Sequence, residues 1–413
     1  MFCRDTLSRI CSTDQRREDW SSMRTLVLNA DYPRFLAWLY GRHPGLDTAS
    51  YAEQMAARNA SLFGVADFYS RNFTALGHQA ADVHVNNLSL QSAWAREHGM
   101  TLGTDAGLGA SRKQRLPGWL QRTIAPLKPA LRPWARRLGL SPRLSEQAER
   151  VVLAQIEDFK PELILNQDVF YVSTGLVRRM RDLGVRVVIG QVGIEPTKGE
   201  DWNAYDLMLS QLPRVVGSFR AAGVRAEVCH LAFEPAVLDA LSLAPTPDID
   251  VSFVGSVSED HRDRIALLEF VAERHDLKLW GNIPNSLPVT SPLRRCFQGE
   301  VWGSEMYDVL RRSRISLNSH IDMAGEEAGN MRLFEATGVG SFLLTDFKRN
   351  LHTLFKPERD VAVWRSREEC SAAIERYLGD NEKRMEIAAN GQKQTLAKHT
   401  FRGRVEEILR FIQ

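Results

Sequence analysis

Short apolar runs alternate with amphipathic segments along most of the chain. In the first half, the runs that predict buried strands are 25–30, 81–85, 162–166, 185–189, 207–210 and 226–230. Between them, stretches such as 66–76, 146–159 and 175–183 carry apolar residues at helical spacing. Strands that alternate with helices in this way predict a parallel sheet with helices on both faces.

The same pattern starts again after the proline-containing segment 243–248. Strands are expected at 250–255, 277–280, 315–318 and 341–345, with helices at 261–275, 304–312, 368–377 and 381–398. The predicted fold class is α/β, with two doubly wound, Rossmann-like domains that face each other across a cleft. Their expected bounds are 23–243 and 244–398, and a terminal helix in 399–413 is expected to pack back on the first domain.

Two segments depart from this alternation. Residues 1–22 are polar and charged without a period, so we expect a poorly ordered extension before a plausible start at Met23. Residues 106–145 contain nine Lys or Arg and no Asp or Glu, with tryptophans and leucines interleaved. This basic stretch suits peripheral contact with an anionic membrane surface or an anionic acceptor. The alternative is a solvated helical excursion packed on the first domain.

Composition excludes several classes of protein. The chain has 413 residues, of which 44% are apolar and 25% charged, as in soluble globular proteins of two or three domains. No apolar run approaches the ~18 residues that span a bilayer, and the N-terminus lacks an apolar signal core. A net charge of +2 does not favour nucleic acid as a partner. Five scattered cysteines without a C-x-x-C pair fit a cytoplasmic protein.

The most informative segment is 327–346. It combines a glycine-bearing turn, a short helix with Glu327 and Glu335 near its two ends, and a buried strand. A helix start offers free N–H groups to the phosphates of a nucleotide diphosphate, and a later carboxylate can accept hydrogen bonds from ribose. If the whole segment between the glutamates were helical, it would rise about 12 Å. The alternative is an amphipathic helix whose two glutamates face water.

Several segments carry a resemblance to a known family. In the second domain they are 251–256, 261–262, 279–281, 330–336, 340–346, 388–391 and 399–401, and in the first domain 63–67, 76–78, 166–168, 204–206, 220–224 and 231–233. The chain resembles nucleotide-sugar-dependent glycosyltransferases of the GT-B fold, and most of all the group related to the spore-maturation protein CgeB. This resemblance implies a cytoplasmic enzyme that moves a sugar from a nucleotide diphosphate to a surface glycan or a protein.

The resemblance also implies roles for the glutamates and their neighbours. Glu327 and Glu335 match the Glu-x7-Glu spacing of retaining GT-B transferases, in which the later glutamate binds ribose and the earlier one lies near the transferred sugar. Glu326 is the alternative for the earlier position. The turn and helix start between them would offer backbone N–H groups to the diphosphate and the sugar, from Gly329, Asn330, Met331 and Arg332.

Further donor candidates follow other strands of the second domain. Gly255, Ser256 and Arg262 follow its first strand, where such enzymes place a basic side chain on the leaving phosphate; Arg264 is the second choice. Because the departing diphosphate gains negative charge, a preorganised arginine would stabilise the transition state. The remaining candidates are Asn282, Trp302, Tyr307 and His320. Trp302 or Tyr307 would stack on the base, unless each is simply a core residue.

On the acceptor side, Asp31 and Asp168 follow strands of the first domain and Glu195 is a weaker third candidate. Each aspartate can orient an acceptor hydroxyl or act as a general base, or it can cap a helix. The histidines lack metal-ligand spacing, and neither a metal nor another cofactor is expected. Two other functions remain open: a nucleotide-sugar epimerase or hydrolase on the same scaffold, and a non-catalytic surface-assembly or sugar-binding protein.

Overall fold

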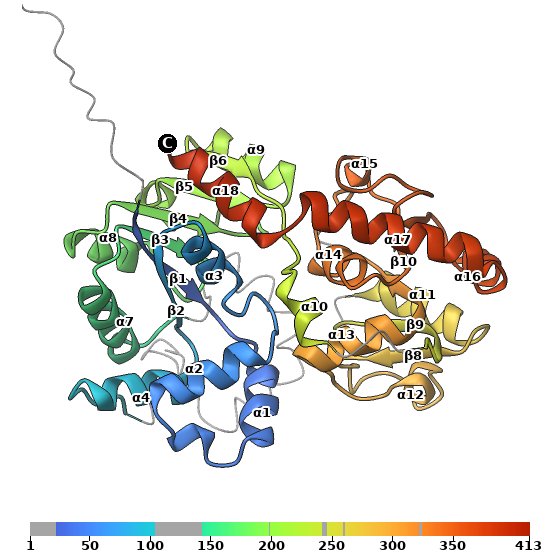
Figure 1. The fold of residues 1–413 in the computed structure, drawn as a ribbon, viewed down its shortest axis with the longest axis horizontal. Coiled ribbons are helices and arrows are strands. Elements are labelled where there is room, and N and C mark those ends of the chain that lie inside the picture. Colours follow the sequence, from blue (N-terminus) through green and yellow to red (C-terminus); the bar gives the residue numbers. More distant parts are fainter. Residues whose placement is uncertain (1–21, 104–142, 198, 242–245, 259–260, 322–323) are drawn as a thin grey trace, which may run out of the picture.

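The computed structural model describes residues 22–103, 143–197, 199–241, 246–258, 261–321 and 324–413, which form two α/β domains side by side (Figure 1). Nearly all of the expected extension 1–22 and most of the basic segment 106–145 lie outside the described residues. The expectations about these two segments therefore stay predictions.

The first domain is built on a six-stranded parallel sheet in the order β2-β1-β3-β4-β5-β6. Its strands are β1 (Arg24–Asn29), β2 (Gln79–His84), β3 (Leu163–Asn166), β4 (Val187–Gln191), β5 (Leu207–Ser210) and β6 (Ala226–Val228). Its helices are α1 (Pro33–Arg42), η1 (Leu46–Thr48), α2 (Tyr51–Ala60), α3 (Phe68–Ala75), α4 (Leu88–Glu97), α7 (Glu146–Phe159), α8 (Thr174–Asp182), η4 (Trp202–Ala204), α9 (Pro213–Ala221) and α10 (Ala236–Ala240). Central strands such as β3 are buried along their whole length because helices cover both faces.

The second domain has a five-stranded parallel sheet in the order β11-β10-β9-β7-β8. Its strands are β7 (Ile249–Val254), β8 (Leu277–Trp280), β9 (Ser313–Asn318), β10 (Leu343–Asp346) and β11 (Ala362–Trp364). Its helices are α11 (Arg262–Ala272), α12 (Leu293–Cys296), α13 (Gly303–Arg312), α14 (Met331–Gly338), α15 (Leu351–Leu354), α16 (Arg367–Gly379) and α17 (Asn381–Lys398). The predicted pair of doubly wound domains is confirmed, although the prediction missed the three-residue strand β11.

The last helix, α18 (Phe401–Ile412), leaves the second domain and lies against the first (Figure 1). The ring of Phe401 packs 5.2 Å from Phe68 and 5.0 Å from Tyr69, both in α3. The backbone N–H of Phe233 donates to the carbonyl of His399 over 2.8 Å. The chain therefore crosses between the domains a second time.

The two domains also share a close joint near α13. The N–H of Ser304 donates to the carbonyl of Ser61 over 3.0 Å. A Cβ on Gly303, whose φ is +56°, would lie 1.8 Å from that same carbonyl oxygen, so only glycine fits here. Beside it, Trp302 stands edge-on to Phe63 at 4.7 Å. This joint holds the start of α13 on the first domain.

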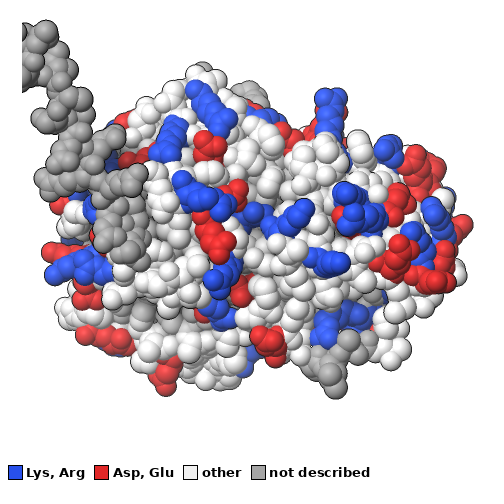
Figure 2. Space-filling view, turned by 45° about the horizontal axis from the view of Figure 1, so that its top comes forward, with Lys and Arg blue, Asp and Glu red and all other residues white. Residues whose placement is uncertain are grey.

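On the face shown in Figure 2, charge is spread rather than concentrated. Figure 2 shows lysines and arginines interspersed with acidic side chains over the face in view. None of the helices in the described ranges is long and apolar enough to cross a membrane.

Candidate functional site

The start of α14 is the centre of the candidate site. The helix begins at Met331, and Asn330 before it is extended, with φ −78° and ψ 156°. The condition of a fully helical segment from Glu327 to Glu335 is therefore not met, because the first four residues of that segment precede the helix. Among the described residues no side chain caps α14, since the amide of Asn330 donates instead to Oδ1 of Asn318 over 2.8 Å. An uncapped helix start of this kind suits an anion.

Glu335 lies one turn into α14 and is only 5% exposed. Its Oε2 is 2.9 Å from Nη1 of Arg332, and Arg332 also donates through Nε to the carbonyl of Val254 at the end of β7. Burial raises the pKa of Glu335, and the charge of Arg332 opposes that rise. The pair therefore ties α14 to the strand beside it.

Glu327 reaches the other domain. Its Oε1 accepts a 2.9 Å hydrogen bond from the backbone N–H of Arg214, at the start of α9 in the first domain. A carboxylate at a helix N-terminus is favourable because it meets free N–H groups and the positive end of the dipole. Arg214 also pairs with Glu195 over 2.7 Å. Glu326 is instead on the surface and pairs with Arg349, so Glu327 is the carboxylate that faces the opposite domain.

Gly329 brings the two domains into direct contact. A Cβ there would lie 2.8 Å from Cγ of Gln211, which directly follows β5. The N–H of Gly329 donates to Nε2 of His320 over 3.3 Å, and Nδ1 of His320 lies 2.7 Å from Asp346. Burial favours a higher pKa for Asp346, but the hydrogen bond from His320, together with the nearby charge of Lys348, brings it below its usual value. With both ring nitrogens engaged, His320 holds the turn before α14.

The loop after β7 places the remaining donor candidates beside α14. Ser256, which follows Gly255, donates through Oγ to Oδ1 of Asn282 over 2.6 Å. Arg264 is buried and donates to the carbonyls of Ser256 and Ser319 over 2.7 and 2.6 Å. It thus bridges the ends of β7 and β9, the point at which the winding of the sheet reverses.

Two arginines and two aromatic residues were proposed as donor contacts, and burial separates them. Arg262 is exposed at the first residue of α11, whereas the guanidinium of Arg264 already donates to backbone carbonyls. Tyr307 is 1% exposed and packs against Phe233, so neither ring face is open to a base. Trp302 is half-buried in the joint with the first domain. Tyr307 is therefore a core residue, as the alternative to base stacking predicted.

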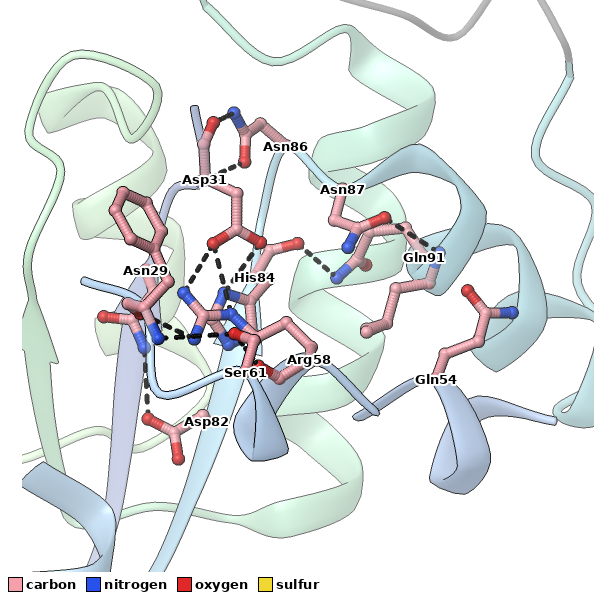
Figure 3. A network of polar contacts seen from close by, with 12 residues as sticks. Asn29, Asp31, Gln54, Arg58, Ser61, Asp82, His84, Asn86, Asn87 and Gln91 are labelled. Atoms are coloured by element: carbon pink, nitrogen blue, oxygen red, sulfur yellow. Dashed lines mark hydrogen bonds and ion pairs between the residues drawn. The ribbon is translucent and has the colours of Figure 1, made fainter. Parts of the chain in front are cut away.

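Asp31 lies in a buried polar cluster at the end of β1 (Figure 3). Arg58 approaches its Oδ1 to 2.6 Å, and Nδ1 of His84 lies 3.1 Å from its Oδ2. Burial alone would raise the pKa of Asp31, but His84 and Arg58 bring it well below its usual range. With its side chain 1% exposed, Asp31 is placed as a structural ion, which corrects its proposed role as a base.

Asp168 has a different environment. Its Oδ1 accepts hydrogen bonds from the N–H groups of Phe170 and Tyr171, over 2.8 and 3.1 Å. The residue is half-buried, and burial raises its pKa although the two N–H groups oppose the change. Asp168 thus caps a turn and not a helix, since Ser173 caps the following α8, and it keeps a carboxylate with increased proton affinity.

Sequence reasoning missed Tyr32, which follows Asp31 directly. The residue is 66% exposed, yet desolvation by surrounding protein, followed by the charges of Asp168 and Glu335, raises the pKa of its hydroxyl. Its ring packs 6.0 Å from that of Phe63, and the charges that act on its hydroxyl come from both domains. Its position directly after the first strand was the available signal, since side chains at the carboxyl ends of strands face the space between the domains.

No set of three or more His, Cys, Asp or Glu side chains in the described part of the chain is grouped so that it could hold a metal ion. The donors gathered near α14 are instead backbone N–H groups and arginines.

Comparisons with known proteins agree with this architecture. Residues 262–410 match the protein-family model described as glycosyl transferase-like. A comparison with curated protein sequences gives no match. A glycosyltransferase from Rickettsia africae has 8% identity and a TM-score of 0.55, over 94% of this chain and 97% of that chain. Sucrose-phosphate synthase from Thermosynechococcus elongatus has 10% identity and a TM-score of 0.54, over 94% and 98%.

Alr3699/HepE from Anabaena, in complex with UDP-glucose, is similar with 11% identity and a TM-score of 0.53, over 94% of this chain and 99% of that chain. With the two parallel-sheet domains, these likenesses establish the GT-B fold. The matched family description and the fold together support a glycosyltransferase.

Proposed function

We propose that this protein transfers a sugar from a nucleotide-diphosphate donor to a glycan or protein acceptor, with retention of configuration and without a metal, as a member of the CgeB-like group. The observation that carries the proposal is the uncapped start of α14, which faces the first domain beside Gln211. HepE, a structure of the same fold, was solved with UDP-glucose, so uridine donors are the first to test.

The donor is assigned to the ends of β7 and β9. Its diphosphate lies on the N–H groups of Met331 and Arg332, with the exposed Arg262 as the mobile cation. Glu335 binds the ribose, and Glu327 lies near the transferred sugar. As the glycosidic bond breaks, negative charge grows on the diphosphate, and these preorganised donors stabilise it more than they stabilise the bound donor.

The acceptor is assigned to the first domain. Asp168 has a raised pKa and the freedom that Asp31 lacks, so it orients the acceptor hydroxyl and accepts its proton. The charges of this carboxylate and of Glu335 both act on the hydroxyl of Tyr32, and the exposed ring of Tyr32 offers the acceptor sugar an apolar face.

Nucleotide binding tests the donor site. A thermal-shift panel of nucleoside diphosphates and UDP-sugars should show stabilisation by at least one of them, because a ligand of the folded state raises stability by mass action. In Glu335→Gln, calorimetry should give about tenfold weaker binding of that nucleotide. Glu326→Gln is the matched control and should bind like the wild type. Equal affinity in the two variants would remove Glu335 from the site.

Removal of Glu335 also has a structural effect that the sequence did not suggest. Because Glu335 neutralises Arg332 in a buried pair, Glu335→Ala should lower the melting temperature. Glu335→Gln is therefore the better variant for measuring nucleotide binding.

Product analysis with donor alone separates the transferase from a hydrolase or epimerase. Rapid release or rearrangement of the sugar without acceptor would favour those alternatives.

A further inference from the structure

A cavity of about 590 Å³ opens in the second domain, at the carboxyl ends of β9, β10 and β11. It is lined by the buried side chains of His320 and Asp346 and by residues of the first turns of α11. Carboxyl ends of parallel strands are where α/β sheets bind ligands, and this volume is typical of small-molecule sites. Of the donor and acceptor candidates only His320 lines this cavity, and the donor assignment above does not use it.

The charges around the cavity largely cancel within the protein. Lys348 pairs with Asp346 over 3.2 Å, and Arg367 pairs with Glu368 over 2.9 Å. After these pairs, one cation and one carboxylate of the lining, Arg365 and Asp263, have no ion-pair partner among the residues that the structure places. A diphosphate carries at least two negative charges, so this balance does not fit a nucleotide.

The same two groups fit a sugar. Hydroxyl groups both donate and accept hydrogen bonds, so one sugar unit can use an arginine and a carboxylate together. The guanidinium of Arg365 is already positioned, 4.3 Å above the ring of Phe347. Phe347 is 40% exposed and Trp364 also lines the cavity, which supplies apolar surface for the C–H face of a pyranose.

We propose that this cavity binds an uncharged sugar unit of the acceptor glycan, away from the bond being formed, an inference that rests on the proposed transferase function. His320 connects the two sites, since it lines the cavity and accepts the N–H of Gly329 just before α14. The cavity therefore selects a glycan, rather than a bare protein, as the acceptor.

Ligand-observed NMR with methyl glycosides of glucose, galactose, N-acetylglucosamine and rhamnose tests this proposal. At least one glycoside should show saturation transfer from the wild-type protein. Its binding should weaken about tenfold or more in Asp263→Asn and in Arg365→Gln, because each change removes a charged hydrogen-bonding partner. Arg295→Gln, an exposed arginine of α12 that does not line the cavity, is the matched control and should bind normally.

Saturating UDP should leave the glycoside signal in place, because the donor site is separate. The proposal is overturned if none of the four glycosides binds, if Arg365→Gln binds like Arg295→Gln, or if UDP displaces the glycoside. Stabilisation by UDP in the same preparation tests the proposed donor site separately. If the protein binds UDP but none of the glycosides, only the proposed sugar site is wrong.

Discussion

Asp31 and Asp168 occupy equivalent places on one sheet but have opposite chemistry. Each lies two residues beyond its strand, and the two strands, β1 and β3, are direct neighbours. Around Asp31, Arg58 and His84 more than offset the effect of burial and lower its pKa. Around Asp168 only backbone N–H groups oppose burial, and its pKa rises. The neighbours of a carboxylate, rather than its position after a strand, decide whether it is a structural ion or a base.

The largest effect is expected from Arg58→Ala, which leaves Asp31 buried without its closest cation. Removal of one partner of a buried ion pair typically costs about 3–5 kcal/mol. Chemical denaturation followed by circular dichroism should show this loss. Asp168→Asn is the control, with a change below about 1 kcal/mol, because the amide oxygen still accepts the two backbone N–H groups. Similar losses in both variants would contradict the contrast between the two aspartates.

The next largest effect is expected on catalysis. Asp168→Asn removes the proposed base, so turnover in sugar transfer should fall about 10²-fold or more, with UDP affinity unchanged. The acid limb of the wild-type pH profile should lie above pH 3.8, the ordinary pKa of an aspartate, because burial raises that of Asp168. A variant that keeps most of its turnover would return Asp168 to the role of a turn cap.

The pH dependence of stability extends the comparison to Asp82. This residue of β2 is buried and accepts a hydrogen bond from Asn29 of β1. Burial raises its pKa from 3.8 to about 7, so the folded protein holds a proton that the unfolded chain releases. The favourable contribution is complete below pH 3.8 and is lost as the pH rises through about 7. Asp31 has the opposite sign, since its contribution is complete above pH 3.8 and is lost progressively as the pH falls from 3.8 toward its lower folded-state pKa.

Asp82→Asn should therefore flatten the decline in unfolding free energy between about pH 4 and about pH 7, a decline of at most ~1.4 kcal/mol per pH unit from this residue. Melting temperatures measured across that range test it, with Asp248→Asn as the exposed control. An unchanged slope would mean that Asp82 is ionised in the folded protein.

The smallest effect is expected at the contact between domains. In Gly329→Ala the new methyl group meets Gln211, whose flexible side chain can move, so the loss of stability should stay below about 1 kcal/mol while the KM for donor rises severalfold. Gln211→Ala in the same chain should restore the KM. If the double variant binds donor no better than Gly329→Ala, the contact does not govern donor binding.

Periodicity alone located most strands, because a strand buried on both faces is a nearly continuous apolar run. It missed β11, which has three residues of which only the first is fully buried. Periodicity placed Glu327 near one end of α14, but the helix begins at Met331. The difference arises because a glycine-bearing turn and a helix can both carry polar residues at similar spacing. Asp31 was misjudged because its partners, Arg58 and His84, lie 27 and 53 residues away in the chain.

The amino-acid order by itself determined the two wound sheets and the segment around α14, since apolar periodicity and glycine-bearing turns act over a few neighbouring residues. Only the tertiary structure decided which charges are available. In the folded protein Asp31 is buried against Arg58, and Arg264 bridges two strand ends. Arg262, Asp168 and Tyr32 remain accessible. The reason is physical: proton affinity and accessibility depend on groups within a few ångströms in space, and those groups come from distant parts of the chain.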